Sequence, residues 1–114
     1  MSNNINDILN QFVEGISKII GSNLKKVILY GSYARNTQNQ DGEISDIDIM
    51  ILVDMPEKDI KTITKAILDY STDIDLKYDV LLSPYIETID NYNNRLSYMM
   101  FYQNIEREGK VLYA

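Results

Sequence analysis

The segment Asp46–Val53 (DIDIMILV) constrains the fold of this chain more than any other stretch. Its alternate positions 47, 49, 51 and 53 are all β-branched aliphatic residues, and the opposite positions carry Asp46 and Asp48 followed by two more apolar side chains. Strict alternation predicts a β-strand, because successive side chains in a strand point to opposite faces. We therefore expect a buried strand with a pair of carboxylates at its entrance.

Helix-like and strand-like patterns alternate on either side of this strand. Apolar residues that recur at three- and four-residue steps predict helices, and short apolar runs predict strands. The expected elements, in chain order, are a helix over Ile5–Ile20, a strand over Lys25–Tyr30, a short helical start after Gly31, the strand over Asp46–Val53, a helix over Ile60–Tyr70, a strand over Leu76–Leu82, a helix opened by Ser83-Pro84, helical structure over Arg95–Glu108 with Gly109 as its cap, and an edge strand over Val111–Tyr113.

This order predicts one α/β (α+β) domain over residues 1–114, with a mixed sheet of three to four strands and helices packed against it. A length of 114 residues with 45% hydrophobic side chains is ordinary for one globular domain. No apolar run approaches the ~20 residues of a membrane span. The first residues lack the basic and apolar regions of a secretory signal, so we expect a cytoplasmic protein.

The charge and the missing residue types limit the chemistry. The chain has no histidine and no cysteine, which excludes a thiolate nucleophile, a His-containing catalytic triad and a zinc finger. Its net charge of −6 argues against direct nucleic-acid binding and suits a basic protein partner. Carboxylates, hydroxyls, backbone amides and a few cations remain, and oxygen ligands of this kind suit Mg²⁺.

Gly31-Ser32 directly follows the predicted strand Lys25–Tyr30. A glycine at this point allows a sharp turn and the close approach of a ligand, and backbone amides that open a helix favour phosphate. A plain turn is the alternative interpretation, since a Gly-Ser pair alone is weakly specific.

Asp46 and Asp48 lie two residues apart in the predicted strand, so their side chains share one face. Two like charges side by side are unfavourable unless something neutralises them, and a divalent cation would do so. The alternative is that Asp46 caps the strand together with Ser45 and that Asp48 faces water.

Asp79 stands inside the apolar run LKYDVLL, the third predicted strand. Buried acids are rare unless they are paired or bound to a metal, so Asp79 is a candidate third ligand. Asp73 and Asp75 lie just upstream and compete for this role. Asp75 also has the same strand parity as Asp79, so the choice between these two remains open.

Together these motifs resemble the polymerase-β-like nucleotidyltransferase superfamily. Gly31-Ser32, thirteen intervening residues and then Asp46-Ile47-Asp48 form its signature, within LYGSYARN at 29–36 and SDIDIMILV at 45–53. The ending NIEREGKVLYA at 104–114 is typical of the minimal nucleotidyltransferase (MNT) branch. Members of that branch are the antitoxins of HEPN–MNT toxin–antitoxin pairs.

The resemblance implies a role for each matching residue. Gly31 and Ser32 would bind the triphosphate of ATP, and Asp46, Asp48 and Asp79 would be catalytic and would bind Mg²⁺. Two positions depart from the common family pattern GSRARG, because Tyr33 replaces its first Arg and Asn36 replaces its final Gly. Arg35 is then the only nearby arginine, and it either braces the loop or contacts phosphate.

The function that the resemblance implies is Mg²⁺-dependent transfer of AMP from ATP to a hydroxyl of a cognate HEPN ribonuclease toxin. The expected acceptor is a tyrosine, and the chain would act as the antitoxin. One alternative is an antitoxin that neutralises its partner by binding alone. Another is an aminoglycoside-type nucleotidyltransferase, which would need a partner or a second copy to complete its pocket. A homo-oligomer and a hetero-complex are both compatible with the sequence.

Overall fold

The structure is a computed structural model that describes residues 4–35 and 46–114. Four strands within these residues form one sheet, and they are β1 (Leu24–Tyr30), β2 (Ile47–Val53), β3 (Leu82–Thr88) and β4 (Lys110–Tyr113). Their order across the sheet is β3-β2-β1-β4. β1 is antiparallel to β2 and β4, whereas β3 runs parallel to β2. The predicted α/β fold with a mixed sheet is confirmed.

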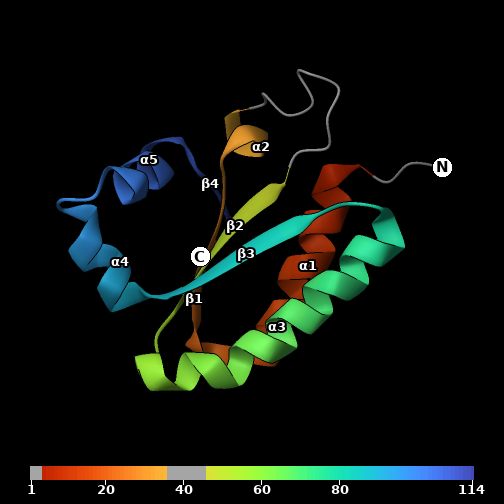
Figure 1. Ribbon diagram of the computed structural model, residues 1–114, viewed down its shortest axis with the longest axis horizontal. Coiled ribbons are helices and arrows are strands. Elements are labelled where there is room, and N and C mark those ends of the chain that lie inside the picture. Colours follow the sequence, from red (N-terminus) through yellow and green to blue (C-terminus); the bar gives the residue numbers. More distant parts are fainter. Residues whose placement is uncertain (1–3, 36–45) are drawn as a thin grey trace.

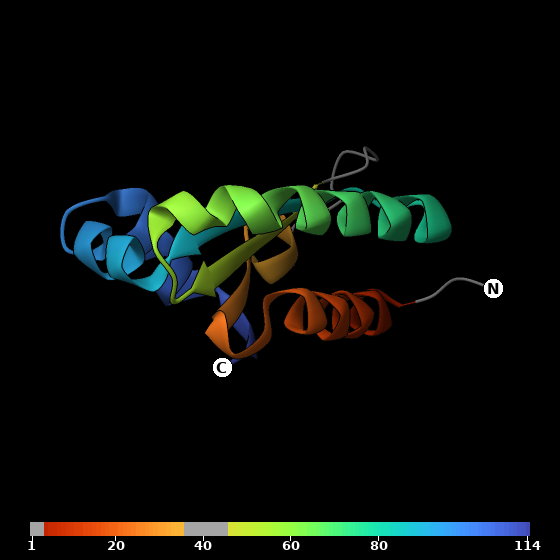
Figure 2. The same cartoon turned by 90° about the horizontal axis from the view of Figure 1, so that it is seen from below.

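Helices cover both faces of this sheet. Those in the described residues are α1 (Ile5–Ile20), α2 (Ser32–Arg35), α3 (Glu57–Tyr78), α4 (Ile89–Leu96) and α5 (Met100–Glu108), with a 3-10 turn at Gly21–Asn23. α1 and α3 run alongside each other on one side of the strands, and α4 and α5 lie on the other (Figures 1 and 2).

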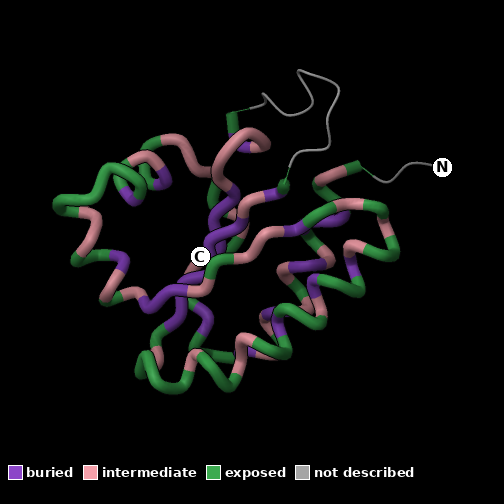
Figure 3. The backbone as a smooth tube through the Cα atoms, in the orientation of Figure 1, coloured by how far each residue is buried: buried purple, intermediate pink, exposed green. Residues whose placement is uncertain are grey.

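β2 is the centre of two separate apolar cores. Ile47, Ile49 and Ile51 are fully buried and face the core formed with α1 and α3. Met50 and Leu52 are equally buried and face the second core, which includes side chains of α4 and α5. The buried backbone accordingly follows the strands through the middle of the molecule (Figure 3). The expectation of a strand covered on both faces is confirmed.

α1 has the predicted bounds because both of its ends carry clear signals. The side chain of Asn4 accepts a hydrogen bond from the backbone amide of Asp7, which caps the first turn. Gly21 ends the helix with φ +72°, a conformation that glycine adopts without a steric penalty.

The predicted strand over Leu76–Leu82 is wrong. α3 continues to Tyr78, because its apolar positions keep helical spacing beyond Tyr70: Ile74 is buried and the Tyr78 hydroxyl donates to the Gln11 side chain on α1. Leu76 is 80% exposed, so the apolar run LKYDVLL is divided between a helix end and the start of β3. Asp79 lies between the two elements.

The C-terminal predictions are confirmed in part. Ser83-Pro84 does not open a helix but lies within β3, an edge strand where proline is tolerated. Of the helical structure expected over Arg95–Glu108, the part from Met100 to Glu108 is confirmed as α5, whereas Arg95 and Leu96 end α4 and residues 97–99 between the two helices are not helical. Gly109 caps α5 and β4 forms the opposite edge of the sheet, both as predicted. None of the helices in residues 4–35 and 46–114 is long and apolar enough to cross a membrane.

Candidate active site

The turn after β1 brings Gly31 against Asp48. Tyr30, the last residue of β1, pairs with Asp48 of β2 in the antiparallel ladder. Gly31 follows with φ +75°, and a Cβ atom placed on it would lie 2.3 Å from the Oδ2 atom of Asp48. Any side chain at position 31 would therefore have to displace this carboxylate, and it would also be strained by the positive φ. The structure brings together two residues that the sequence predicted for one site.

α2 begins immediately after this turn. Ser32 is its first residue, and the amide of Arg35 donates to the Gly31 carbonyl at 3.1 Å, which closes the short helix over Gly31. Tyr33 packs against the core of α1 and α3. Asn36, the second departure from the family pattern, lies outside the described residues.

Asp46 and Asp48 lie at the start of β2 and keep the two-residue spacing of a shared face. Asp46 is exposed, whereas Asp48 is half-buried. Burial raises the pKa of the Asp48 carboxyl above its usual range, and the negative charge of Asp46 raises that pKa further, while Arg35 lowers it. The charged form of Asp48 is thus disfavoured in this environment. A divalent cation bound beside it would offset this electrostatic cost. This donor set fits Mg²⁺, which is commonly held by one or two carboxylates together with substrate phosphates.

Tyr30 shares this environment. Burial, followed by the charges of Asp48 and Tyr85, raises the pKa of the Tyr30 hydroxyl to about 12. Its ring meets that of Phe101 edge to face, with centroids 5.8 Å apart, which connects the end of β1 to α5.

A pocket of about 240 Å³ opens over Asp48. Gly31, Arg35 and Asp48 line it from the sheet side. Phe101, Asn104 and Glu108 line it from α5, where their spacing puts them on one helical face. None of these three α5 residues is among the site residues predicted from the sequence, although the three- and four-residue steps from 101 to 108 mark a common helical face.

Arg35 connects the two walls of this pocket. Its Nη1 atom lies 3.4 Å from Oε2 of Glu108, and both side chains are partly exposed, at 50% and 36%. The structure thus shows Arg35 in contact with α5, and an exposed pair of this kind adds little stability. Arg35 also acts on Asp48, whose pKa it lowers.

Asp79 does not lie in a buried strand, so burial gives no reason to expect it to be a third metal ligand. It is exposed and caps α3 in the left-handed conformation, with φ +54°. Across the described ranges, no three acidic side chains come close enough together to hold a metal ion. The β3 residue paired with Asp48 is Ser83.

Asp75 has a different contact. Its Oδ1 atom accepts a hydrogen bond of 2.8 Å from the backbone amide of Leu82, the first residue of β3. Burial raises the pKa of Asp75, and the hydrogen bond from Leu82 opposes that shift. Asp75 therefore holds the end of α3 to the start of β3.

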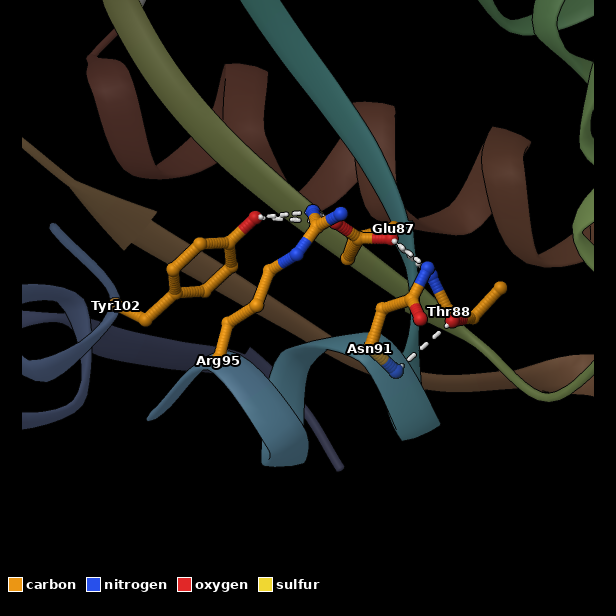
Figure 4. Close-up of polar contacts among 5 residues, drawn as sticks. All are labelled: Glu87, Thr88, Asn91, Arg95 and Tyr102. Atoms are coloured by element: carbon orange, nitrogen blue, oxygen red, sulfur yellow. Dashed lines mark hydrogen bonds and ion pairs between the residues drawn. The ribbon is translucent and has the colours of Figure 1, made fainter. Parts of the chain in front are cut away.

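A buried polar network holds α5, which forms the second wall of the pocket, and the preceding helix α4 against β3 (Figure 4). Glu87 of β3 is only 4% exposed, and its Oε2 atom accepts from Arg95 Nη1 at 2.6 Å and from the Tyr102 hydroxyl at 3.0 Å. Its Oε1 atom accepts hydrogen bonds from the backbone amide of Thr88 and from the side-chain amide of Asn91. One carboxylate thereby ties β3 to α4 and α5, and burial raises the pKa of Tyr102 to about 12.

Comparison with known proteins gives a consistent result. Residues 9–109 match the model of the nucleotidyltransferase domain family. Two similar proteins of Methanocaldococcus jannaschii are both named "putative protein adenylyltransferase". MJ0604 is 31% identical, over 92% of this chain and 94% of its own length. MJ0141 is 38% identical, over 75% of this chain and 92% of its own length.

Two solved structures share the fold. A toxin–antitoxin crystallised with AMP-PNP has a TM-score of 0.57 at 17% identity, with 97% of this chain and 74% of that chain covered. A mutant of the toxin–antitoxin MntA-HpeT has a TM-score of 0.53 at 16% identity, with 92% and 71% covered. At these identities the likeness establishes the fold.

Proposed function

Because this chain belongs to the nucleotidyltransferase domain family, we propose that it is a Mg²⁺-dependent protein adenylyltransferase that acts as an antitoxin. It transfers AMP from ATP to a hydroxyl of a HEPN-type toxin, with tyrosine as the expected acceptor. The acceptor hydroxyl forms a bond to the α-phosphorus, the bond from that phosphorus to the bridging oxygen breaks, and pyrophosphate leaves.

The observation that carries this proposal is the carboxylate pair beside Gly31. Asp46 and Asp48 lie at the start of β2, and the pKa of Asp48 is raised by burial and by Asp46. Gly31, which has no side chain, packs directly against the Asp48 carboxylate. These two carboxylates would hold Mg²⁺, which when bound offsets the charge of the triphosphate. A site of this kind needs neither histidine nor cysteine, in keeping with the composition of the chain.

The remaining residues of the site have roles in binding. Gly31 and Ser32 would accommodate the triphosphate at the turn into α2, as the family resemblance implies. Arg35 lines the same pocket as Asp48, and it would be the cation that faces the triphosphate. Asp79, which the resemblance also implies, is exposed at the end of α3, so its contribution has to be tested separately from that of the pair.

Two findings support a protein as the acceptor. The relatives with 31% and 38% identity are named protein adenylyltransferases, and both solved structures with this fold are toxin–antitoxin proteins. The net charge of −6 suits association with a basic partner, because complementary charges speed encounter and favour one orientation.

Mass spectrometry tests the proposal. The purified chain is incubated with MgATP and the HEPN toxin encoded beside its gene, and the intact mass of the toxin is then measured. We expect the toxin to gain the mass of one or more AMP groups, at a tyrosine located by peptide fragmentation. Omission of Mg²⁺ should prevent the gain. An unmodified toxin, under conditions in which a related adenylyltransferase modifies its own partner, would refute the function.

A further inference from the structure

We infer that Glu108 is the carboxylate that accepts the hydrogen of the attacking hydroxyl. This inference rests on the proposed function and assigns the proton-accepting step to a residue that lines the pocket, which the predicted third carboxylate Asp79 does not. Glu108 belongs to the C-terminal motif and is not among the residues that the sequence predicted for the site.

The reaction needs such a group. As the hydroxyl oxygen bonds to the α-phosphorus and pyrophosphate leaves, the hydroxyl proton must pass to an acceptor. In phosphoryl transfer, a carboxylate that orients the nucleophile and takes its proton is sufficient, because the main catalytic contributions are positioning and charge stabilisation. On this assignment the proton moves from the hydroxyl to Glu108 and then to solvent.

The other groups near the pocket are poorly suited to this task. The chain has no histidine, and Asp46 and Asp48 are the proposed metal ligands. Tyr30 keeps its proton at neutral pH, since its pKa is about 12. Asp79, at the end of α3, is not among the residues that line the pocket.

The position of Glu108 suits the role. It lines the same pocket as Asp48 but from α5, whereas Asp48 lines it from the sheet, so a hydroxyl that enters between these walls meets a carboxylate across from Asp48. Its side chain is 36% exposed, which leaves it accessible to an acceptor from solution. Arg35 Nη1 lies 3.4 Å from Glu108 Oε2 and Arg107 Nη2 lies 3.6 Å from Glu108 Oε1, and the pair with Arg35 keeps the carboxylate at the pocket.

Glu108 could instead serve only to hold Arg35 in place, and the two roles differ in what a substitution changes. If Glu108 only positions Arg35, then Glu108→Gln weakens the binding of MgATP. If Glu108 accepts the proton, the same substitution frees Arg35 for the phosphates but removes the acceptor. The catalytic role therefore predicts slow transfer with MgATP binding retained.

The test compares Glu108→Gln with Glu108→Asp and with Glu14→Gln as a matched control. Glu14 also forms a 3.4 Å ion pair, with Lys18, on the exposed surface of α1. The kcat for AMP transfer to the HEPN toxin is measured at saturating MgATP, and the Kd for MgATP is measured by calorimetry. Circular dichroism and thermal melting establish that each variant is folded.

For Glu108→Gln we expect kcat to fall at least about 100-fold, the usual range for loss of a general base. The Kd for MgATP should stay within about fivefold of wild type, the effect of a surface ion pair. Glu108→Asp should recover part of kcat, and Glu14→Gln should match wild type. Wild-type kcat in Glu108→Gln, or a loss that follows weaker MgATP binding, would overturn the inference. Failure of the wild-type chain itself to transfer AMP would instead refute the proposed function.

Discussion

Gly31 and Asp48 are in such close contact that a single added carbon on Gly31 would lie 2.3 Å from the Oδ2 atom of Asp48. The contact arises because Tyr30, the residue before the glycine, is the ladder partner of Asp48. The backbone of the proposed phosphate turn and the half-buried carboxylate thus form one unit at the ends of β1 and β2. A substitution at Gly31 should act on the carboxylate as well as on the turn.

Gly31→Ala should lower both stability and activity. The left-handed φ of +75° costs alanine roughly 1–2 kcal/mol, and the new methyl group must also displace Asp48. Gly21→Ala is the matched control, because Gly21 has φ +72° with no atom within 4 Å of the added carbon. We expect both variants to unfold at lower urea concentrations than wild type. AMP transfer should fall at least about tenfold only for Gly31→Ala, because an ångström-scale displacement of a catalytic group has costs of this order. Equal activity in the two variants would contradict the proposed contact.

Asp48→Asn should stabilise the metal-free protein at neutral pH while abolishing its response to Mg²⁺. The folded-state pKa of Asp48 is raised, so the wild-type chain loses stability as the pH rises through that pKa. The variant avoids this loss, and because Asp48 is largely solvent-screened the gain at pH 7 should be only a few tenths of a kcal/mol.

The pH dependence gives this prediction a definite sign. The advantage of Asp48→Asn should vanish below the ordinary aspartate pKa of 3.8, where the carboxyl is protonated in both states. Added Mg²⁺ should raise the melting temperature of the wild-type chain and leave that of the variant unchanged. Equal Mg²⁺ responses in the two proteins would argue against a metal at Asp48.

Asp79→Gly tests whether Asp79, the third carboxylate predicted from the sequence, contributes to catalysis in addition to Asp46 and Asp48. Asp79 has φ +54° at the end of α3, where glycine is the preferred residue, so we expect a gain of about 0.5–1 kcal/mol in unfolding free energy. AMP transfer should remain near wild type. Asp73→Gly is the control. Because Asp73 lies inside α3, this substitution should lower the unfolding free energy by a few tenths of a kcal/mol. A folded Asp79→Gly protein without activity would establish Asp79 as a third catalytic carboxylate.

Glu87→Gln should lower stability far more than a similar change on the surface. Glu87 is buried and accepts hydrogen bonds from Arg95 and Tyr102, so the loss of its charge should cost about 1–3 kcal/mol. Asp69→Asn is the comparison, since Asp69 forms a 2.7 Å ion pair with Lys65 in solvent. That variant should unfold at nearly the same urea concentration as wild type. Similar urea midpoints for the two variants would show that the Glu87 network contributes little.

The sequence predicted the elements whose local pattern and tertiary packing agree. α1 has its apolar stripe, an asparagine cap and a terminal glycine, and β2 has strict alternation of apolar residues. The mixed character of the sheet followed from these elements. Asp46, Asp48 and Gly31 could be identified because the ends of adjacent strands place them together.

The run LKYDVLL was misassigned for a physical reason. Short apolar runs are compatible with a strand and with the end of a helix, and only contacts between distant residues decide between them. Here the contacts of Tyr78 with Gln11 on α1 and of Asp75 with Leu82 hold this stretch as a helix end. Because of this misassignment, Asp79 was predicted to be a buried third carboxylate of the site.

The residues that form the second wall of the pocket also could not be predicted from a local sequence pattern. Phe101 and Glu108 reach the pocket only because α4 and α5 fold back across the sheet, and the Glu87 network that fixes these helices joins residues up to fifteen positions apart. Neither Arg35 nor Glu108 carries a signal in sequence that pairs it with the other.

Neutralisation of the toxin by the double variant Asp46→Asn/Asp48→Asn tests the central claim most directly. The HEPN toxin is expressed in cells with either the wild-type chain or the double variant, at matched levels established by immunoblot, and growth is measured together with AMP on the recovered toxin. Catalysis through the carboxylate pair predicts that the wild-type chain restores growth and modifies the toxin, and that the double variant does neither. Restored growth with an unmodified toxin in the double variant would contradict the account and establish neutralisation by binding alone.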